Sequence, residues 1–312
     1  MEGLAGGHKV RILVLGGMGF LGKALIKRLT ESDNHEITVF DRTIPGTKDS
    51  HIQCMQGSFE SGYDFDSLVK GTDLVFHLIS TSIPGNEKKV LEEVHDNVIP
   101  SIELFNACAR QGVHRIVFMS SGGTVYGAST RPNKETDLLS PINTYGLQKA
   151  MIEQALQYVS HDTGLEYQIV RLSNPYGPGQ NPLGTLGLIT KLVYQALHHE
   201  TINIFGDGSV VRDFIYIDDA IQAILDIMHN GETNAIYNVG RGMGVSVSDV
   251  VAAISSTLPE KIHIEQKPGR KVDVPYSVLD IEKYKHISSI DKFISLDQGI
   301  MQTYQYFKEH SR

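Results

Sequence analysis

A chain of 312 residues with 41% hydrophobic content is long enough to bury the core of one large α/β domain or of two joined lobes. Its 28 basic and 36 acidic residues give a net charge of −8 without a basic run, which argues against nucleic acid or an anionic membrane as a partner. No apolar stretch approaches the ~18 residues of a membrane span, and the N-terminus lacks a signal-peptide pattern, so we expect a cytoplasmic protein. Cys54 and Cys108 stand far apart in the sequence, so we expect the reduced thiols of a cytoplasmic protein and no metal site.

Short β-branched runs alternate with amphipathic stretches through the first two-thirds of the chain. This rhythm predicts a parallel, doubly wound α/β sheet over residues 1–172, with later segments near 210–240 returning to it. Beyond Asn174 the elements become shorter and richer in Gly, Pro and Asn, so residues 173–312 are predicted to form a smaller, substrate-binding lobe. The predicted strands are Val10–Leu15, Glu36–Phe40, Leu74–Ile79, Arg115–Ser120 and Tyr167–Leu172, and the predicted helices are Gly22–Thr30, Val90–Gln111 and the segment around Tyr145.

A glycine-rich loop follows the first predicted strand directly. Gly16 allows a tight turn, Gly19 lets a pyrophosphate approach the backbone, and Gly22 permits close packing of helix on strand. The N-terminus of the helix that opens around Phe20 and Leu21 then faces the phosphates. This loop between a strand and a helix predicts a dinucleotide-binding Rossmann domain.

Asp41 ends the second predicted strand, about twenty residues after the loop. Its carboxylate can accept hydrogen bonds from the adenosine ribose hydroxyls and would repel a 2′-phosphate, which favours NAD over NADP. Arg42 weakens this preference, because an arginine can pair with a 2′-phosphate. The alternative interpretation of Asp41 and Arg42 is an ordinary turn at a strand end.

Tyr145 and Lys149 lie one helical turn apart in the sequence, so on a helix their side chains share one face. A free tyrosine has a pKa of ~10, and a nearby ammonium favours the phenolate and lowers that pKa. Such a pair can take the proton of a sugar hydroxyl while a neighbouring cofactor takes the hydride. The spacing alone is a weak signal, since chance tyrosine–lysine pairs are common on helices.

Further motifs, in order along nearly the whole chain, give this pair a context. On their order and spacing the chain resembles the extended short-chain dehydrogenase/reductases, specifically the nucleotide-sugar branch typified by UDP-galactose 4-epimerase. The resemblance implies bound NAD, a UDP-sugar substrate and 4-epimerisation through a transient 4-keto sugar. The motifs are the glycine loop, Ser121-Gly-Gly-Thr-Val-Tyr-Gly127, Tyr145 with Lys149, Arg171-Leu-Ser-Asn174-Pro-Tyr-Gly-Pro-Gly179, Ile204-Phe-Gly-Asp-Gly208, Arg212-Asp-Phe-Ile-Tyr-Ile-Asp-Asp219, Tyr237-Asn-Val-Gly240, and Arg270 with Asp273.

The resemblance implies that Tyr145 is the catalytic base and that Lys149 lowers its pKa while binding the nicotinamide ribose. Family members usually carry a Ser or Thr two positions before Thr124, whereas this chain has Gly122 there. Thr124 is therefore our first choice for the hydroxyl that bonds the sugar O4, Ser121 is the second, and a tyrosine that works without such a hydroxyl is the third.

The resemblance also assigns ligand contacts away from the catalytic pair. It places Ser58 near the adenine, where the family often has an aspartate, and Leu78 beside NAD. The small Ser277 is expected to admit N-acetyl sugars, unless the register slips and Tyr276 takes its place. The residues assigned to the UDP-sugar are Ser121, Thr124, Tyr145, Asn174, Arg212, Arg270, Asp273 and Ser277, the arginines through charge-assisted phosphate contacts.

Three further expectations concern assembly and the reaction. Family members pair through four helices, so we expect a homodimer formed by the helix after Asn97 and the Tyr145 helix. Gly123 and Thr124 replace the carboxylates that dehydratases carry there, so dehydration is disfavoured. One alternative to an epimerase is a nucleotide-sugar 4-ketoreductase; such enzymes generally prefer NADPH, and Asp41 argues against that cofactor. The other is an idle NAD(P)-sensing protein, a class that commonly lacks the Tyr–Lys pair.

Overall fold

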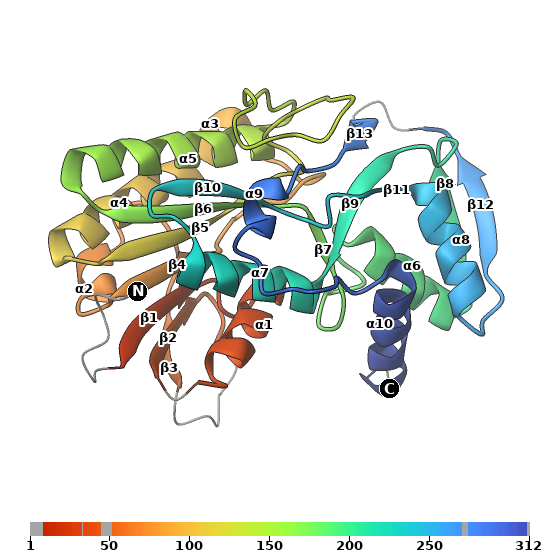
Figure 1. The fold of residues 1–312 in the computed structure, drawn as a ribbon, viewed down its shortest axis with the longest axis horizontal. Coiled ribbons are helices and arrows are strands. Elements are labelled where there is room, and N and C mark those ends of the chain that lie inside the picture. Colours follow the sequence, from red (N-terminus) through yellow and green to blue (C-terminus); the bar gives the residue numbers. More distant parts are fainter. Residues whose placement is uncertain (1–8, 33, 45–51, 270–273, 311–312) are drawn as a thin grey trace.

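A parallel sheet forms the centre of the molecule (Figure 1). The computed structural model describes residues 9–32, 34–44, 52–269 and 274–310, and within them this sheet has 7 strands in the order β10-β6-β5-β4-β1-β2-β3. Neighbouring strands are parallel throughout, as βαβ connections require. The strands are β1 (Val10–Leu15), β2 (His35–Asp41), β3 (Ile52–Gln56), β4 (Leu74–His77), β5 (Arg115–Ser121), β6 (Glu166–Leu172) and β10 (Ala235–Val239).

Helices cover both faces of this sheet and explain why its inner strands are buried along almost their whole length. On one face, α1 (Phe20–Leu29) and α7 (Ile217–Asn230) share a core with alternate residues of β1, β2 and β4. On the other face, α4 (Ile99–Gln111) and α5 (Thr144–Thr163) share a second core with the remaining residues of those strands. The predicted doubly wound Rossmann sheet is therefore confirmed.

The strand order reverses between β1 and β4, which lie side by side although β2 and β3 come between them in sequence. At such a switch point the loops leaving the two carboxyl ends turn to opposite faces and leave a crevice where ligands bind. The glycine loop after β1, Leu78 after β4 and Ser121 at the end of β5 all belong to this edge.

The predicted single helix Val90–Gln111 is instead three joined pieces: α3 (Val90–Glu93), a π-helix η2 (Val94–Val98) and α4. Pro100 lies in the first turn of α4 and has no N–H to continue an α-helical ladder back to residue 96. A wider turn bypasses this gap, with the Ile99 N–H donating to the Val94 carbonyl. Such π-turns inside helices often occur at functional sites.

A smaller set of elements adjoins the carboxyl edge of the central sheet and forms the C-terminal lobe (Figure 1). β10 and α7 return to the central sheet, and the predicted boundary at residue 172 stays a prediction. The described strands of the lobe are β7 (Asn174–Tyr176), β9 (Val211–Tyr216), β11 (Gly244–Ser246) and β13 (Tyr276–Ser277) in one sheet and β8 (Thr201–Phe205) with β12 (His263–Lys267) in another. The remaining helices are α2 (Phe65–Val69), α6 (Leu188–Leu197), α8 (Val247–Thr257), α9 (Glu282–Lys285) and α10 (Leu296–His310).

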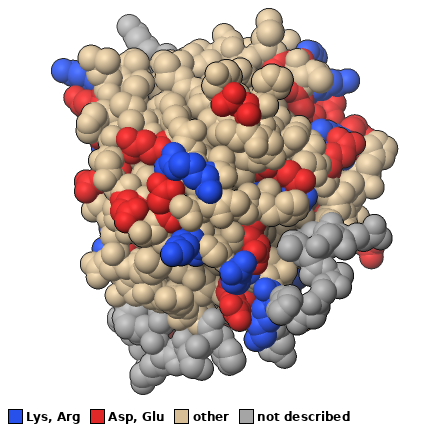
Figure 2. All heavy atoms as spheres, turned by 90° about the vertical axis from the view of Figure 1, so that its left-hand side faces the viewer, with Lys and Arg blue, Asp and Glu red and all other residues tan. Residues whose placement is uncertain are grey.

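The surface on the left-hand side of Figure 1 carries acidic and basic side chains interspersed among uncharged ones (Figure 2). No helix in the described part of the chain is long and apolar enough to cross a membrane. The same residues contain no group of 3 or more His, Cys, Asp or Glu side chains arranged to hold a metal ion.

Candidate active site

The loop between β1 and α1 leaves backbone space open toward the switch point. Gly16 adopts a φ of +81°, which favours glycine, and its carbonyl accepts the Gly19 N–H at 3.1 Å. At Gly22 a Cβ would stand 2.4 Å from the Gly16 carbonyl oxygen, so only glycine fits the packing of helix on loop. The first turn of α1, with Phe20 and Leu21, has no side-chain cap, and its N–H groups are those that bind phosphates in such loops.

Asp41 lies at the end of β2 beside this loop. Its carboxylate accepts the Met18 N–H at 3.0 Å and the Arg42 N–H at 2.7 Å. This fixes the carboxylate next to the glycine loop, the arrangement that binds a ribose diol. Ser58 is exposed after β3, and Leu78 follows β4 with its N–H bonded to the Leu15 carbonyl at 3.0 Å.

These residues fit NAD by an observation independent of the motif. A Cβ at Gly22 would collide with the backbone of Gly16 and Gly17 and push α1 away from the loop, and the uncapped N-terminus of α1 and the Asp41 carboxylate both adjoin that loop. When bound there, the dinucleotide would have its phosphates held by the first turn of α1 and its ribose by Asp41.

Tyr145 and Lys149 are carried to this crevice by the first turns of α5. The Asn143 side chain caps the helix by accepting the Gly146 N–H at 2.7 Å. A Cβ at Gly146 would stand 2.4 Å from the Thr124 carbonyl oxygen, so glycine lets the helix lie directly on the β5 loop. The Lys149 Nζ is 5.9 Å from the centre of the Tyr145 ring and donates to the Met119 carbonyl at 2.9 Å.

Burial disfavours the charged form of both Tyr145 and Lys149. It lowers the pKa of Lys149 to about 8, although the Glu153 charge acts in the opposite direction. Burial also raises the pKa of Tyr145 well above its usual range, the Glu93 charge raises it further, and a hydrogen bond with Ser121 lowers it. In the chain by itself, burial and the Glu93 charge raise the pKa of Tyr145, and its lowering by Lys149 stays a prediction for the enzyme with its ligands bound.

The hydroxyls at the end of β5 are arranged differently from our first expectation. The Thr124 Oγ1 points to the Ser121 carbonyl at 3.5 Å, whereas the Ser121 hydroxyl bonds the Tyr145 side chain. A Cβ at Gly122 would stand 2.6 Å from Leu279 Cδ1 and 2.9 Å from the Arg171 carbonyl oxygen. The usual serine of the family is thus sterically excluded here, and Ser121 is the hydroxyl in contact with the tyrosine.

A buried ion pair supports α5 one turn after Lys149. Glu153 and Arg171 are 0% and 3% exposed, and the Arg171 Nη2 lies 2.6 Å from the Glu153 Oε2. Ser120 donates to the same carboxylate, and Arg171 also donates to the Tyr126 hydroxyl at 2.8 Å. This network fixes the tyrosine helix against β5 and β6.

The lobe brings part of the predicted UDP-sugar set to the same edge. The Asn174 side chain donates to the Asp213 carbonyl at 2.9 Å and lies close to Gly123 in the β5 loop. Arg212, on β9, donates to the Val274 carbonyl at 2.6 Å, and Ser277 pairs with Arg212 in the sheet register. Arg270 and Asp273 lie outside the described residues.

Several site residues escaped the sequence reasoning. Glu93 and Gln148 are each 1% exposed and form a polar cluster next to Tyr145, although a glutamate and a glutamine on helices ordinarily indicate a solvated face. Asp213 is also 1% exposed and accepts backbone N–H groups from two other loops of the lobe. Its place in the motif with Arg212 was the available signal. His77 is fully buried among Phe59, Phe105 and Phe118.

Residues 12–240 match the model of the NAD dependent epimerase/dehydratase family. The chain belongs to this family. Its description names the cofactor that the glycine loop and Asp41 predicted, and the predicted kinship with nucleotide-sugar enzymes of the extended short-chain group is confirmed with it.

Three relatives of the family are similar over nearly their full lengths. The putative UDP-glucose 4-epimerase of Methanocaldococcus jannaschii is 29% identical, over 96% of this chain and 99% of its own. The dTDP-4-dehydro-6-deoxyglucose reductase of Escherichia coli is 29% identical, over 94% and 96%. The crystal structure of a Thermotoga maritima UDP-glucose 4-epimerase with UDP-glucose superposes with a TM-score of 0.90 at 30% identity, covering 97% of this chain and 100% of that one.

Proposed function

We propose that the protein catalyses the NAD-dependent 4-epimerisation of a UDP-sugar, with UDP-glucose and UDP-galactose as the simplest pair. The observation that carries the proposal is the meeting of Tyr145, Lys149 and the Ser121 hydroxyl at the crevice that the glycine loop borders. A tyrosine in contact with a serine hydroxyl and an ammonium is equipped to move a proton on a sugar oxygen. Similarity to UDP-glucose 4-epimerases over the whole chain supports the same substrate class.

In this reaction the chain's own residues move the proton of the sugar O4. When bound, NAD supplies the acceptor for the C4 hydride and later its donor. Tyr145 takes the O4 proton as the C4–H bond breaks, Ser121 bonds O4 and the phenol oxygen, and the Lys149 ammonium stabilises the phenolate. After the 4-keto sugar turns, Tyr145 returns the proton to O4, so the reaction has no net oxidation.

Contacts at the nucleotide end must hold while the sugar turns. We assign Asn174, Arg212 and Arg270 to the diphosphate, and Asp273 to the nucleotide ribose or to holding the arginine in place. Arg270 and Asp273 belong to the segment outside the described residues. Ser277, small and 4% exposed, supports the proposal that N-acetyl sugars are accepted. Replacing Ser277 with tyrosine should suppress turnover of N-acetylated substrates selectively, and equal loss on both sugar types would overturn this assignment.

The decisive experiment incubates the purified protein, without reductant, with UDP-glucose, UDP-galactose and their N-acetyl forms, and resolves the products. Interconversion of C4 epimers supports the proposal. A second incubation supplies NAD(P)H and a 4-keto nucleotide sugar, because the Escherichia coli relative is named a reductase of such a sugar. Consumption of NAD(P)H in the second incubation only would establish the 4-ketoreductase, and no turnover in either would leave the NAD(P)-sensing protein.

The hydroxyl assignment has its own matched pair of variants. Ser121→Ala should lower kcat by about 10²-fold, the lower range for a lost proton-transfer contact. Thr124→Val keeps the shape of the side chain and removes only its hydroxyl, and it should change kcat by a small factor. A large loss in Thr124→Val with a small one in Ser121→Ala would return the role to Thr124.

We also propose a homodimer through α4 and α5. Met151 and Tyr158 on α5 are 38% and 68% exposed, and Ile99 on α4 is 37% exposed, so apolar surface is available on both helices. Val98 and Phe105 do not contribute, since both are buried in the core. A monomer in sedimentation at micromolar concentration would contradict the dimer.

A cytoplasmic location, expected from the cysteine content, is to be tested by fractionation.

A further inference from the structure

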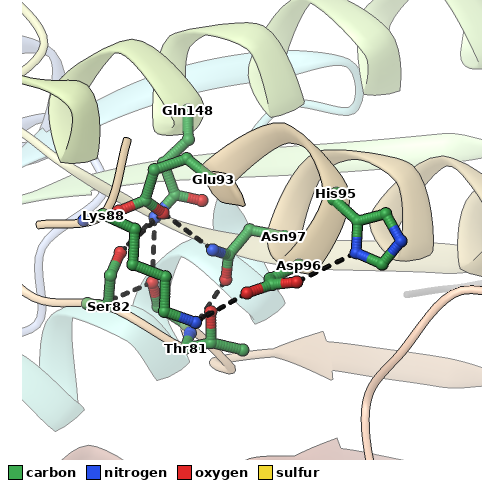
Figure 3. Close-up of polar contacts among 9 residues, drawn as sticks. Thr81, Ser82, Lys88, Glu93, His95, Asp96, Asn97 and Gln148 are labelled. Atoms are coloured by element: carbon green, nitrogen blue, oxygen red, sulfur yellow. Dashed lines mark hydrogen bonds and ion pairs between the residues drawn. The ribbon is translucent and has the colours of Figure 1, made fainter. Parts of the chain in front are cut away.

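A cluster of polar side chains lies where α3, η2 and α5 meet the loop after β4 (Figure 3). Its centre is Glu93, which is 1% exposed. The Glu93 carboxylate accepts the Ser82 hydroxyl at 2.7 Å, the Asn97 side-chain amide at 2.9 Å and the Lys88 N–H at 2.9 Å. A buried carboxylate with this many donors is a built feature of the fold rather than a solvated helix residue.

The cluster joins the loop after β4 to the helix that carries Tyr145. Gln148, 1% exposed, reaches from α5 toward Ser82 and donates to the hydroxyls of Ser80 and Ser82 at 3.0 and 3.3 Å. At the start of the same helix, the Thr144 hydroxyl donates to the Lys88 carbonyl at 2.8 Å. Movement of Glu93 would therefore move both the loop beside the cofactor crevice and the first turns of α5.

The π-helix places Glu93 and Asn97 so that both serve this loop. Asn97, 2% exposed, donates to Glu93, and its side-chain oxygen accepts the Thr81 N–H at 2.8 Å. One side chain of η2 thus satisfies the carboxylate and the loop backbone together. This gives the widened turn at Val94–Val98 a role in the site.

The charges around Tyr145 leave Glu93 as the negative group that acts on it. Lys149 faces the ring from α5, Ser121 bonds it from β5, and His77 is buried with a pKa well below its usual range, so it is neutral. Lys88 and Asp96 pair with each other at 2.7 Å, and the exposed His95 bonds the same aspartate at 3.0 Å. The Glu93 charge raises the pKa of Tyr145.

We propose that Glu93 is the positioning residue of the catalytic pair, fixing the loop after β4 against α5 and placing a negative charge near the phenol of Tyr145. The proposal rests on the proposed function for the step in which Tyr145 takes a proton. In the resting enzyme Tyr145 is a phenol; when the ligands bind, its proton passes to solvent, and the resulting phenolate is the base that takes the O4 proton.

The test removes the charge and keeps the size of the side chain. In Glu93→Gln, saturated with NAD, the acid limb of the pH profile of kcat should move to lower pH by about one pH unit, because a like charge near the phenolate is gone. Glu103→Gln is the matched control, since Glu103 on α4 accepts the Ser61 hydroxyl and the Gly62 N–H, each at 2.9 Å, away from Tyr145. It should keep the wild-type limb. A lower kcat in Glu93→Gln with an unmoved limb would overturn the electrostatic role.

Two further variants keep the proposal testable if Glu93→Gln does not fold. Gln148→Glu adds a second carboxylate to the cluster and should move the acid limb of the kcat profile to higher pH. An unmoved acid limb in this variant would also overturn the charge effect. Ser82→Ala keeps the Glu93 charge and removes one of its donors, so NAD should bind several-fold more weakly with the limb unchanged. Unaltered NAD binding in Ser82→Ala would overturn the positioning of the loop.

One readout is independent of sugar turnover. The chain has 0 tryptophans, so ultraviolet difference spectra report tyrosine ionisation without interference, and subtracting Tyr145→Phe isolates the one phenol. In NAD-saturated Glu93→Gln this phenol should ionise at lower pH than in the wild type. A shifted ionisation without epimerisation would refute the proposed function and keep the role of Glu93, whereas epimerisation with an unshifted ionisation would do the reverse.

Discussion

We predict that Asp213 makes the stability of the C-terminal lobe dependent on pH. The side chain is 1% exposed on β9 and accepts the backbone N–H groups of Arg241, Gly242 and Leu279 at 2.8, 3.1 and 3.3 Å. Burial raises its pKa from 3.8 to about 6 although these three donors act in the opposite direction. The carbonyl of the same residue accepts the Asn174 side-chain amide, so Asp213 joins two loops of the lobe to a predicted substrate contact.

The sign and size of the effect follow from linkage. An acid whose pKa is about 6 when folded and 3.8 when unfolded binds its proton more tightly in the folded state. Its contribution to the free energy of unfolding is therefore present at low pH and is lost as the pH rises through about 6. A difference of about two pH units corresponds to about 3 kcal/mol, most of which develops between about pH 4 and pH 7.

The assay is urea unfolding of the wild type and Asp213→Asn across this pH range. Subtracting the two free energies of unfolding cancels the other carboxyl groups, and the wild-type value should fall relative to the variant by about 2–3 kcal/mol from pH 4 to pH 7. Asp207→Asn is the control, because Ser209 lowers the pKa of that exposed carboxyl and the sign of its slope is opposite. A flat or rising difference for Asp213→Asn would refute the reasoning.

Three other substitutions test the supports of the site. Gly22→Ala should lower the free energy of unfolding by about 1–3 kcal/mol and weaken NAD binding, because the new Cβ would stand 2.4 Å from the Gly16 carbonyl oxygen. Thermal unfolding and NAD titration measure the two effects. Gly19→Ala, whose Cβ would stand 3.3 Å from the same oxygen, should have milder effects. Asp41→Asn should weaken NAD binding about tenfold and reduce the preference for NAD over NADP, measured by competing the two in titration. Glu153→Gln should cost about 3–5 kcal/mol in urea unfolding, because it leaves the Arg171 charge, 3% exposed, without its partner; a loss below about 1 kcal/mol would contradict the network.

The fold could be predicted where one physical signal dominates. Val10–Leu15 is the same strand in sequence and structure, because an apolar run covered on both faces leaves no other arrangement. Ile52–Gln56 was missed, since it is a half-exposed edge strand whose polar residues resemble a loop. The helix over residues 90–111 was predicted without its π-turn, although Pro100 was the signal that the α-helical ladder is interrupted.

The candidate site likewise contains residues that the sequence could predict and residues that it could not. Glycines, Asp41 and the Tyr–Lys pair are readable because their chemistry requires those residue types at fixed spacing. The choice of Ser121 over Thr124 could not be predicted from sequence, because it depends on the turn of the β5 loop, which directs the Thr124 hydroxyl to the Ser121 carbonyl and the Ser121 hydroxyl to Tyr145. Glu93 was equally hidden, since its burial results from the fold of a loop and two helices around it.

Two buried carboxylates act on the catalytic pair with related effects. Glu153 raises the pKa of Lys149 against desolvation and so favours the ammonium, while Glu93 raises the pKa of Tyr145 and favours the phenol. At neutral pH the chain by itself therefore retains both protons, and in the proposed reaction Tyr145 becomes a base only when further positive charge or a bonded sugar hydroxyl stabilises its phenolate. Neutralising the two glutamates should shift the pKa of Tyr145 in opposite directions. Loss of the Glu93 charge should lower that pKa. Loss of the Glu153 charge should make Lys149 lose its proton more readily, and so raise the pKa of Tyr145. A tyrosine that ionises only with its ligands in place does not remain a strong base in an empty, water-accessible crevice.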